Sequence, residues 1–223
     1  MRVTVNIINA FGDNADGGNP AGVVLDADTL TDSQKLTIAK KVDLSETAFV
    51  SKSLQADYKL DFFIPTRQIA HCGHATIDVF SHLSKIGMIG QGFFTKETID
   101  GNRKILIDND VVYMEQLAPT FIEIGQYNKD ILDSIGITEE QLIQSPKIVN
   151  TGNSFVIIGV KSEQILSGIN PNMEKIISVS ESLDLVGYYL FTPDTRKKTS
   201  DAATRAFGPR YGINEDAATG MAA

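Results

Sequence analysis

Hydrophobic and polar residues are distributed along the first half of the chain in a pattern that predicts several strands and one early helix. The alternation or short apolar run typical of strands occurs at residues 4–10, 22–25, 47–50 and 58–64, and shorter examples occur near 93–96, 104–107 and 111–116. Between the second and third of these segments, Thr31-Asp32-Ser33-Gln34 has the form of a helix capping box. Leu36, Ala39 and Val42 follow it at helical spacing.

A second helix is predicted after a loop at residues 65–72. It begins near Gly73, and Gly87 is a natural C-terminal stop. Its apolar positions form a wide arc made of Ile77, Val79, Phe80, Leu83 and Ile86. A wide arc indicates a helix that is enclosed on several sides rather than lying on a surface.

The second half of the chain repeats features of the first half in the same order. Gly18-Asn19 is echoed 134 residues later by Gly152-Asn153, Phe63-Ile64-Pro65 is echoed 144 residues later by Phe207-Gly208-Pro209, and Cys72-Gly73-His74 is echoed 147 residues later by Thr219-Gly220-Met221. Offsets that grow slowly are expected of a duplicated domain with loop insertions. We therefore predict two similar domains, at residues 1–117 and 118–223. Gly220 stands three residues before the last residue, so we expect the second domain to lack its central helix here and the natural chain to continue.

Composition and charge narrow the classes of function. Hydrophobic residues make up 42% and charged residues 22% of the 223 residues, which is ordinary for a soluble globular protein, and no apolar run approaches the roughly 20 residues of a membrane helix. A net charge of −8 argues against nucleic acid but not against an anionic small molecule. The single cysteine, Cys72, excludes an internal disulfide and any mechanism with two thiols in one chain, and it fits a reducing cytoplasm.

Gly73 and Gly220 are candidates for binding a negatively charged group. Each follows a polar loop and precedes small residues, so each is a candidate for the first residue of a helix. The N–H groups of a first helical turn bind carboxylates and developing oxyanions, and glycine lets a ligand approach the backbone. Simple turn geometry explains either glycine alone, but two in matched positions predict a clamp for an anionic substrate.

Glu46 is the candidate general acid/base. It lies where a helical segment gives way to a strand, beside the apolar residues Leu44, Ala48 and Phe49. Such neighbours raise the proton affinity of a carboxylate by desolvation, as acid/base chemistry near neutral pH requires. The alternative is a solvated loop glutamate.

His71, Cys72 and His74 allow several interpretations. A metal site needs further ligands, and His82 is the only other histidine. A Cys–His nucleophile pair is disfavoured because neighbours at i and i+2 around a helix start are expected to point in different directions. A buried structural cysteine is the simpler expectation. His74 is expected to donate a hydrogen bond to substrate or to a carboxylate, with a capping or core histidine as the alternative.

Four motifs in order resemble the PhzF phenazine-biosynthesis-like family, which shares the diaminopimelate-epimerase fold. They are Asn19-Pro20-Ala21 with Val23-Val24, Leu44–Phe49, Cys72–Thr76, and Gly212–Gly220. The resemblance implies an α+β fold of two similar domains, each a curved, mostly antiparallel sheet wrapped around a central helix. It also implies an active site between the domains, whose two halves are the Gly73 and Gly220 motifs.

The resemblance further implies an isomerase that needs neither metal nor other cofactor and that forms a homodimer. A carboxylate removes a proton from one carbon of a small anionic metabolite and returns it at another. Glu46 matches the family's acid/base, and His74 and Asp216 match residues around the substrate, although Asp216 is equally suited to capping a helix. Asn19, Gly73, Thr219 and Gly220 are placed by the resemblance at the substrate.

Two departures from the family pattern keep other functions open. Met221 stands where a serine usually follows the second glycine, which leaves open a non-catalytic or regulatory small-molecule-binding protein. Related epimerases use a cysteine before each glycine, but the second of these positions here is Thr219. An amino-acid racemase would then have to pair Cys72 with Glu46 or with a water.

Overall fold

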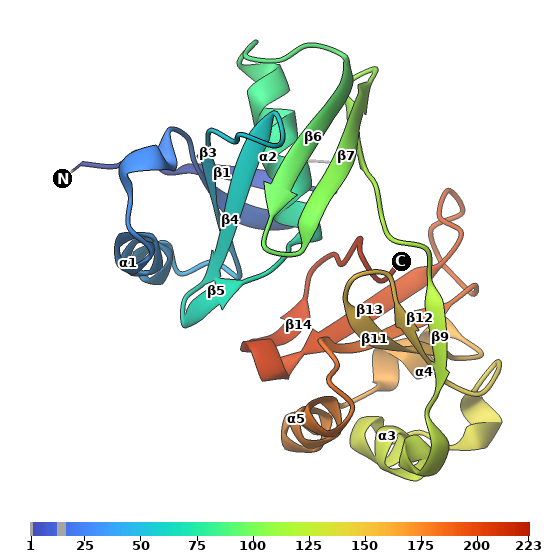
Figure 1. The fold of residues 1–223 in the computed structure, drawn as a ribbon. Coiled ribbons are helices and arrows are strands. Elements are labelled where there is room, and N and C mark those ends of the chain that lie inside the picture. Colours follow the sequence, from blue (N-terminus) through green and yellow to red (C-terminus); the bar gives the residue numbers. More distant parts are fainter. Residues whose placement is uncertain (1, 13–16) are drawn as a thin grey trace. The chain divides into compact units, whose positions relative to one another are not determined.

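A computed structural model describes residues 2–12 and 17–223 of the chain (Figure 1). These residues form two compact units, Met1–Gln116 and Leu117–Ala223. Within the described residues, none of the helices has the length and apolar character needed to cross a membrane.

The first unit is one mixed sheet with a helix on each face. Its strands are β1 (Asn6–Ala10), β2 (Asn19–Val24), β3 (Thr47–Ser51), β4 (Tyr58–Ile64), β5 (Arg67–Ile69), β6 (Gly92–Thr98), β7 (Gly101–Asp108) and β8 (Val111–Met114). Its helices are α1 (Asp32–Val42) and α2 (Gly73–Lys85), with a 3-10 turn at Ala27–Thr29. The strands follow the order β1-β2-β3-β4-β6-β7-β8, and β5 pairs with β4. Neighbouring strands are antiparallel except β2 with β3 and β4 with β6.

The predicted elements of this unit form close to their expected places. The capping box at Thr31 and Gln34 starts α1 as predicted. Gly87 follows α2 and has a left-handed backbone conformation, with φ at 73°. Its amide donates to the Ser84 carbonyl at 3.0 Å, so this glycine ends the helix as predicted. The prediction of a loop at residues 65–72 is wrong in part, because β5 forms within this segment and pairs with β4 after a tight turn.

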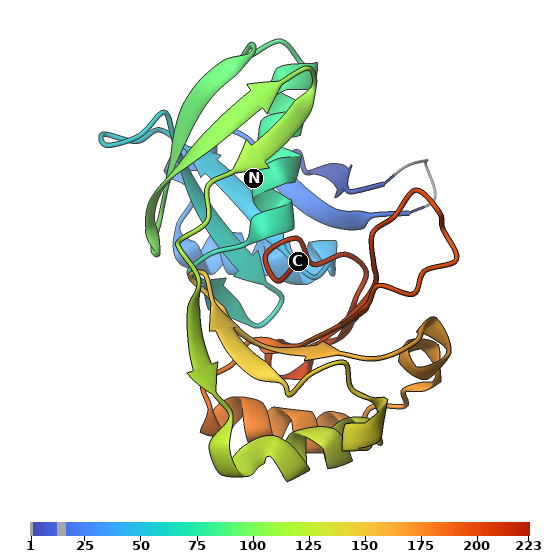
Figure 2. The ribbon, with the colours of Figure 1, turned by 90° about the vertical axis from the view of Figure 1, so that its right-hand side faces the viewer.

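The first sheet curls around α2. This helix contacts both β1 and β8, the two ends of the strand order, as well as β2 and β3 between them. Figure 2 shows the helix between the blue strands and the green strands of the unit. Val79, Phe80 and Leu83 are fully buried in the resulting core, as the apolar arc predicts. Ile86 is 49% exposed, because α2 has already ended at Lys85.

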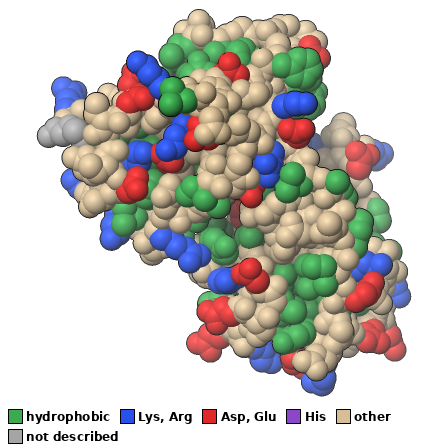
Figure 3. All heavy atoms as spheres, viewed as in Figure 1, with side chains coloured by type: hydrophobic (Ala, Val, Ile, Leu, Met, Phe, Trp, Pro, Cys, Tyr) green, Lys and Arg blue, Asp and Glu red, His purple; other side chains and the backbone are tan. Residues whose placement is uncertain are grey.

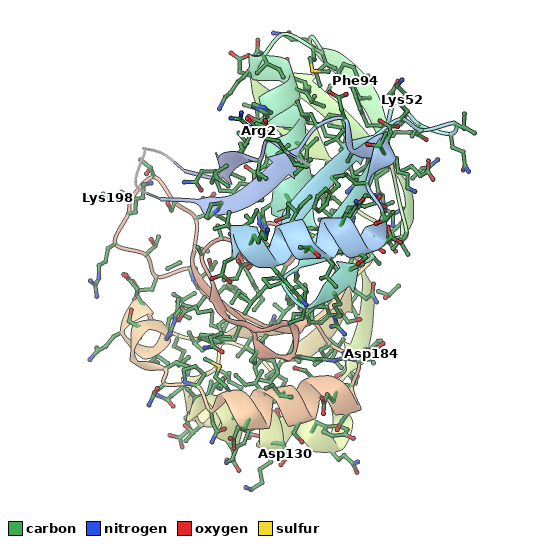
Figure 4. All side chains as sticks on the ribbon, turned by 90° about the vertical axis from the view of Figure 1, so that its left-hand side faces the viewer. Arg2, Lys52, Phe94, Asp130, Asp184 and Lys198 are labelled. Carbon is green, nitrogen blue, oxygen red and sulfur yellow. The ribbon has the colours of Figure 1, made fainter. Side chains whose placement is uncertain are left out.

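The other face of the first sheet is covered by α1 (Figure 4). Successive residues of a strand point to opposite faces, so Leu60 and Phe62 of β4 pack in the α2 core while Phe63 packs with Ala39 of α1. Asp61 lies on the α1 face as well, where its Oδ2 contacts the ammonium of Lys35 at 2.5 Å. Both layers of this unit are therefore set by the alternation in its strands.

The second unit is a smaller sheet with helices packed on one face. Its strands are β9 (Thr120–Glu123), β10 (Lys147–Asn150), β11 (Ser154–Gly159), β12 (Gly187–Thr192), β13 (Ala203–Gly208) and β14 (Ile213–Asp216), in the order β14-β13-β12-β11-β10-β9. Its helices are α3 (Asn128–Ile135), α4 (Glu163–Gly168) and α5 (Met173–Ser182), with 3-10 turns at Gly125–Tyr127, Glu139–Gln141 and Pro209–Tyr211. In Figure 1, α3 and α5 lie side by side on one face of the sheet.

The core of this unit lies between that sheet face and the helices. It includes Ile131, Ile135, Ile176, Tyr188 and Phe207, none of them more than 1% exposed. Asp130 of α3 is labelled on the outer side of these helices in Figure 4, and Asp184 is labelled near the end of α5. On the face of the molecule drawn in Figure 3, acidic, basic and hydrophobic side chains are interspersed.

The two sheets contain the same ladder of strands. In the first unit, paired residues run Asn6–Val23–Ala48–Phe62–Ile69 across β1 to β5, and in the second they run Lys147–Ile157–Tyr189–Ala206–Asp216 across β10 to β14. In each ladder the second and third strands are parallel and the other neighbours antiparallel. Aligning the ladders places Ile157, Ala206 and Asp216 at offsets of 134, 144 and 147 residues from their counterparts. These are the offsets of the sequence echoes, so the predicted repetition of the fold is confirmed.

No helix begins at Gly220 in the described residues, as expected for a second domain that lacks its central helix here. Asp216 is the last residue of β14, and Gly220 and Met221 form a turn. Three residues follow Gly220 in the sequence, fewer than the 3.6 residues of one helical turn. Asp216 therefore ends a strand and does not cap a helix here.

Candidate active site

Glu46 and His74 form a buried pair in the first unit. Glu46 immediately precedes β3, and its carbonyl accepts a hydrogen bond from the Gly22 amide of β2 at 3.0 Å. Its Oε2 lies 3.3 Å from Nε2 of His74, the second residue of α2. Each residue is only 6% exposed. The carboxylate that the sequence predicts as acid/base is therefore enclosed and held at an imidazole, not solvated in a loop.

Asn19 sets the orientation of this imidazole. Its amide nitrogen lies 3.3 Å from Nδ1 of His74, and it is 3% exposed. An amide nitrogen only donates, so Nδ1 accepts and the ring proton sits on Nε2, facing Glu46. Nε2 of the ring and Oε2 of Glu46 are in contact at 3.3 Å, the distance of an ion pair. Asn19, which the resemblance places at the substrate, thus contacts a candidate catalytic residue directly.

Cys72 is also part of this cluster. It is buried, as expected, and it packs in the core around α2. Its Sγ lies 3.6 Å from Nδ1 of His74, so the expectation that these two side chains point in different directions is wrong. Cys72 is the extended N-cap residue of α2, and its φ of −144° and ψ of 126° turn the thiol toward the first helical turn.

Three side chains of this cluster bring potential metal ligands together. Glu46, Cys72 and His74 offer ligand atoms that lie within 4.8 Å of one another. The imidazole stands between the other two, with Nδ1 toward the thiol at 3.6 Å and Nε2 toward the carboxylate at 3.3 Å. A metal bonded to one nitrogen at about 2.0 Å and to sulfur at about 2.3 Å needs all ligands to converge on one point. The ligand atoms here instead lie on two sides of the imidazole ring.

Gly73 is the first residue of α2, and it is buried together with His74 and Ala75. The Cys72 side chain makes no capping hydrogen bond to this turn. The first turn of a helix carries N–H groups that the helix itself does not use, and the helix dipole adds positive potential there. This end of α2 is therefore suited to a carboxylate or an oxyanion.

A buried lysine that the sequence pattern did not predict lies behind this turn. Lys96 of β6 is fully buried, and its Nζ lies 2.7 Å from Oγ1 of Thr76 and 3.1 Å from Nδ1 of His71. Burial lowers the pKa of Lys96 to about 7, a shift that Cys72 and Asp100 oppose and Arg103 strengthens. The alternation of residues along β6 could have indicated this burial, because Lys96 and Phe94 lie on the same face of the strand and that face turns toward the core.

Asp78 is a second ionisable group that the apolar arc of α2 did not predict. It is fully buried, and neither carboxylate oxygen has a hydrogen-bond partner in the described part of the chain. Burial raises the pKa of Asp78 to about 8, opposed in part by Lys85. At neutral pH this carboxyl is therefore mostly protonated.

In the second unit, Asp216 and Thr219 contact each other. The Thr219 hydroxyl donates to Oδ2 of Asp216, which closes the segment between the end of β14 and the turn at Gly220. Glu215 forms a two-bonded ion pair with Arg205, at 2.7 and 2.9 Å. Arg205 also donates to the carbonyls of Leu166 and Ile169, so the strand that ends at Asp216 is tied to α4.

The aligned ladders identify the second unit's counterparts of the first-unit residues. Asn153 corresponds to Asn19 and Met221 to His74, and the two second-unit residues are again in contact, with Asn153 Nδ2 3.8 Å from the Met221 sulfur. Thr219 corresponds to Cys72. Gly187 corresponds to Glu46, and a Cβ at Gly187 would lie 1.9 Å from the Phe207 carbonyl oxygen. The second unit therefore keeps the frame of the cluster without its acid, imidazole or thiol.

Comparison with known proteins places the chain in one family. The model of the family described as phenazine biosynthesis-like protein matches residues 8–223. The uncharacterized isomerase YddE of Salmonella typhimurium is 32% identical, with 100% of this chain and 77% of that protein covered. The uncharacterized isomerase YfhB of Bacillus subtilis is 33% identical, with 96% and 75% covered.

Solved structures agree with this assignment. The crystal structure of a phenazine biosynthesis protein of the PhzF family from Bacillus anthracis has a TM-score of 0.88 and 30% identity, covering 99% of this chain and 77% of that one. A hydroxyproline epimerase from Agrobacterium vitis has a TM-score of 0.58 at 12% identity, with 97% and 72% covered, a likeness of fold alone. The predicted epimerase-like fold is thus confirmed.

Proposed function

The chain belongs to the phenazine biosynthesis-like (PhzF) family, and from that premise we propose that it is an isomerase that moves a proton between carbons of a small carboxylate-bearing metabolite. Its relatives named as isomerases support the reaction class. The observation that carries the mechanism is the buried contact between Glu46 and His74, at 3.3 Å.

In this mechanism Glu46 is the single acid/base. Its carboxylate takes a proton from a carbon next to an electron-withdrawing group of the substrate, and the electron pair of the broken C–H bond delocalises into that group. The resulting carboxylic acid returns the proton to a different carbon. Substrate and product are isomers, so no electrons are gained or lost and no further reactant is consumed.

The other candidate residues bind and orient. His74 holds the Glu46 carboxylate, and Asn19 holds His74 in the donating tautomer. The first turn of α2 at Gly73 receives the negative charge of the substrate. For the second unit we propose that Asp216, Thr219 and Gly220 contribute substrate contacts, since the hydrogen bond between Asp216 and Thr219 gives their segment a defined shape.

A two-base racemase is less well supported than a one-base isomerase. Racemisation with two bases needs acid/base groups on opposite faces of the reacting carbon. Glu46 and Cys72 both lie at His74, with their ligand atoms within 4.8 Å of each other. Their counterparts in the second unit are Gly187 and Thr219. Neither side chain is an acid/base near neutral pH. The two mechanisms differ in the fate of the proton: one base can return the same proton to the substrate, whereas two bases exchange it with solvent.

The proposal is tested by proton exchange. The protein is incubated in D2O with a panel of small amino, hydroxy and unsaturated carboxylic acids, and deuterium incorporation is followed by proton NMR and mass spectrometry. We expect at least one acid to incorporate deuterium or to isomerise. Glu46→Gln, which keeps the size of the side chain, should slow this by at least about 10³-fold, the upper part of the range for general acid/base groups.

The matched control is Glu115→Gln, which neutralises an exposed glutamate of the same unit and should leave exchange unchanged. Unaltered exchange in Glu46→Gln would refute the assignment of the base. Binding of an acid to the unmodified protein without any exchange would instead favour the binding or regulatory function that Met221 leaves open. Partial return of label from a substrate deuterated at carbon would distinguish one base from two.

A further inference from the structure

We propose that Lys96 is a positioning residue. It holds the segment from His71 to His74, which includes the start of α2, and so places His74 against Glu46. The inference rests on the proposed function in one respect, namely that this segment carries the chemistry. The contacts themselves do not depend on it.

Lys96 is linked to both sides of Gly73 by a chain of hydrogen bonds. Its Nζ donates to Oγ1 of Thr76 at 2.7 Å, and the Thr76 hydroxyl donates to the Cys72 carbonyl at 2.6 Å. The same Nζ donates to Nδ1 of His71 at 3.1 Å. Lys96 thus connects β6 to His71, before α2 begins, and to Thr76 in the first turn of α2. Gly73 and His74 lie between these two contacts in the chain.

The donors and acceptors of this chain fit only one arrangement. An ammonium or amine of lysine donates to both partners, so the Thr76 oxygen accepts from it and must direct its own proton to the Cys72 carbonyl. Burial lowers the pKa of His71 to about 3, helped by the charges of Lys96 and Arg103, so its imidazole is neutral and Nδ1 is an acceptor. His71 therefore belongs to the support of the site and does not titrate near neutral pH.

Lys96 is costly to bury, and no carboxylate of the described residues is in contact with its ammonium. It makes no ion pair with Asp or Glu in the described residues, and the nearby Asp100 is bound to Arg103 at 2.6 Å. Its other neighbour is the ring of Phe62, whose centroid is 5.4 Å from Nζ. An apolar side chain would satisfy packing at lower cost. The interactions that Lys96 does make all converge on the turn that carries the proposed site.

Lys35 provides the contrast within the same unit. It is also buried, at 6% exposure, but its Nζ contacts Oδ2 of Asp61 at 2.5 Å on the α1 face of the sheet. Its role is accounted for by an ion pair between α1 and β4. A change at Lys35 disturbs a buried lysine of this unit without touching the turn at Gly73.

The test compares four variants by NMR and by proton exchange. Lys96→Met and Thr76→Val break the chain of hydrogen bonds, Thr76→Ser keeps the hydroxyl, and Lys35→Met is the control. The three histidines of the sequence make the imidazole nitrogen signals of His74 readily assignable. We expect Lys96→Met and Thr76→Val to shift the imidazole signals of His74 and the amide signal of Gly73, and Thr76→Ser and Lys35→Met to leave them close to those of the unmodified protein.

Exchange into the acid identified by the D2O panel should follow the same order. Misplacing a reacting group by a fraction of an ångström lowers the rate by about 10- to 100-fold, so Lys96→Met and Thr76→Val should lose that much in kcat with little change in KM. Thr76→Ser should recover most of it. If Lys96→Met does not fold, Thr76→Val decides the question, because it replaces a hydroxyl by a methyl group of similar size.

Unshifted His74 and Gly73 signals in a folded Lys96→Met or Thr76→Val protein would overturn the proposal. So would equal shifts in Lys35→Met, which would show a general loosening of the unit. The NMR outcome stands whether or not Glu46 is the base: exchange that survives Glu46→Gln refutes the proposed mechanism, while the signals of His74 and Gly73 still decide the role of Lys96.

Discussion

The first unit buries many ionisable side chains, and the second buries almost no polar ones, although their sheets share one ladder. Among the described residues of the first unit, the buried Lys, Arg, His, Asp and Glu side chains are Lys35, Glu46, Asp61, His71, His74, Asp78, Lys96 and Arg103. In the described residues of the second unit, the buried polar side chains are Ser134, Ser180 and Thr192. Because each buried charge needs a partner or a shifted pKa, such side chains cost stability. The repeated scaffold thus places its buried ionisable side chains in one copy.

The position of Glu46 illustrates how the copies diverged. In the first unit the residue before β3 projects a carboxylate to His74. In the second unit the corresponding residue is Gly187, and the space of its side chain is taken by the Phe207 carbonyl. The second copy packs backbone where the first places its acid. This comparison leads to three predictions, in order of decreasing effect.

Gly187→Ala should destabilise the protein by about 3 kcal/mol or more. Its Cβ would lie 1.9 Å from the Phe207 oxygen and 2.9 Å from Cα of Gly208, so backbone would have to move in the centre of the second sheet. Urea unfolding measures the loss. Gly168→Ala, at the end of α4 where a Cβ meets no atom within 4 Å, is the control and should change stability little. A tolerated Gly187→Ala would mean that this position has room for a side chain as the first unit does.

Asp78→Asn should remove a pH dependence of stability that arises in the first unit. The pKa of Asp78 rises from 3.8 to about 8 on folding, so between these values the folded protein binds more protons than the unfolded chain. Its contribution to stability is therefore fully present below about pH 4 and is lost as the pH rises to about 8. The slope is at most about 1.4 kcal/mol per pH unit.

Denaturant unfolding of both proteins at pH 5, 6, 7 and 8 tests this. The unfolding free energy of Asp78→Asn relative to the unmodified protein should increase with pH. The control, Asp108→Asn, neutralises an exposed carboxylate of the same unit and should give parallel pH curves. Parallel curves for Asp78→Asn would show that its carboxyl finds a partner that keeps it charged.

Asn19→Ala and Asn153→Ala compare the same position in the two units. Asn19 is 3% exposed and bonds His74, so its loss should cost about 1–2 kcal/mol. Asn153 is half-buried and its partner is a thioether sulfur, a weak acceptor, so its loss should cost less than about 0.5 kcal/mol. Thermal unfolding of both variants measures the difference. Equal losses would mean that the two asparagines support their turns equally.

Local patterns in the sequence predicted much of the fold because the relevant signals lie within a few residues. The capping box at Thr31, the alternation in β4 and the glycine stop after α2 each involve neighbouring residues. The repeat was also accessible, since a duplicated scaffold leaves matched residues at matched offsets. Glu46 and His74 were identified by motif. They are 28 positions apart in the sequence, and their contact is seen only in the structure.

Other features depended on which strands became neighbours. Lys96 reaches His71 and Thr76 only because β6 joins the sheet beside β4 and the sheet then curls around α2. Asp78 looked like a polar position of a helix, and it is buried because that same sheet encloses α2. The sequence by itself therefore determined most strands and both helices of the first unit, the repeat and the candidate acid/base. Tertiary structure decided which ionisable groups are removed from water, because desolvation depends on everything that packs around a side chain.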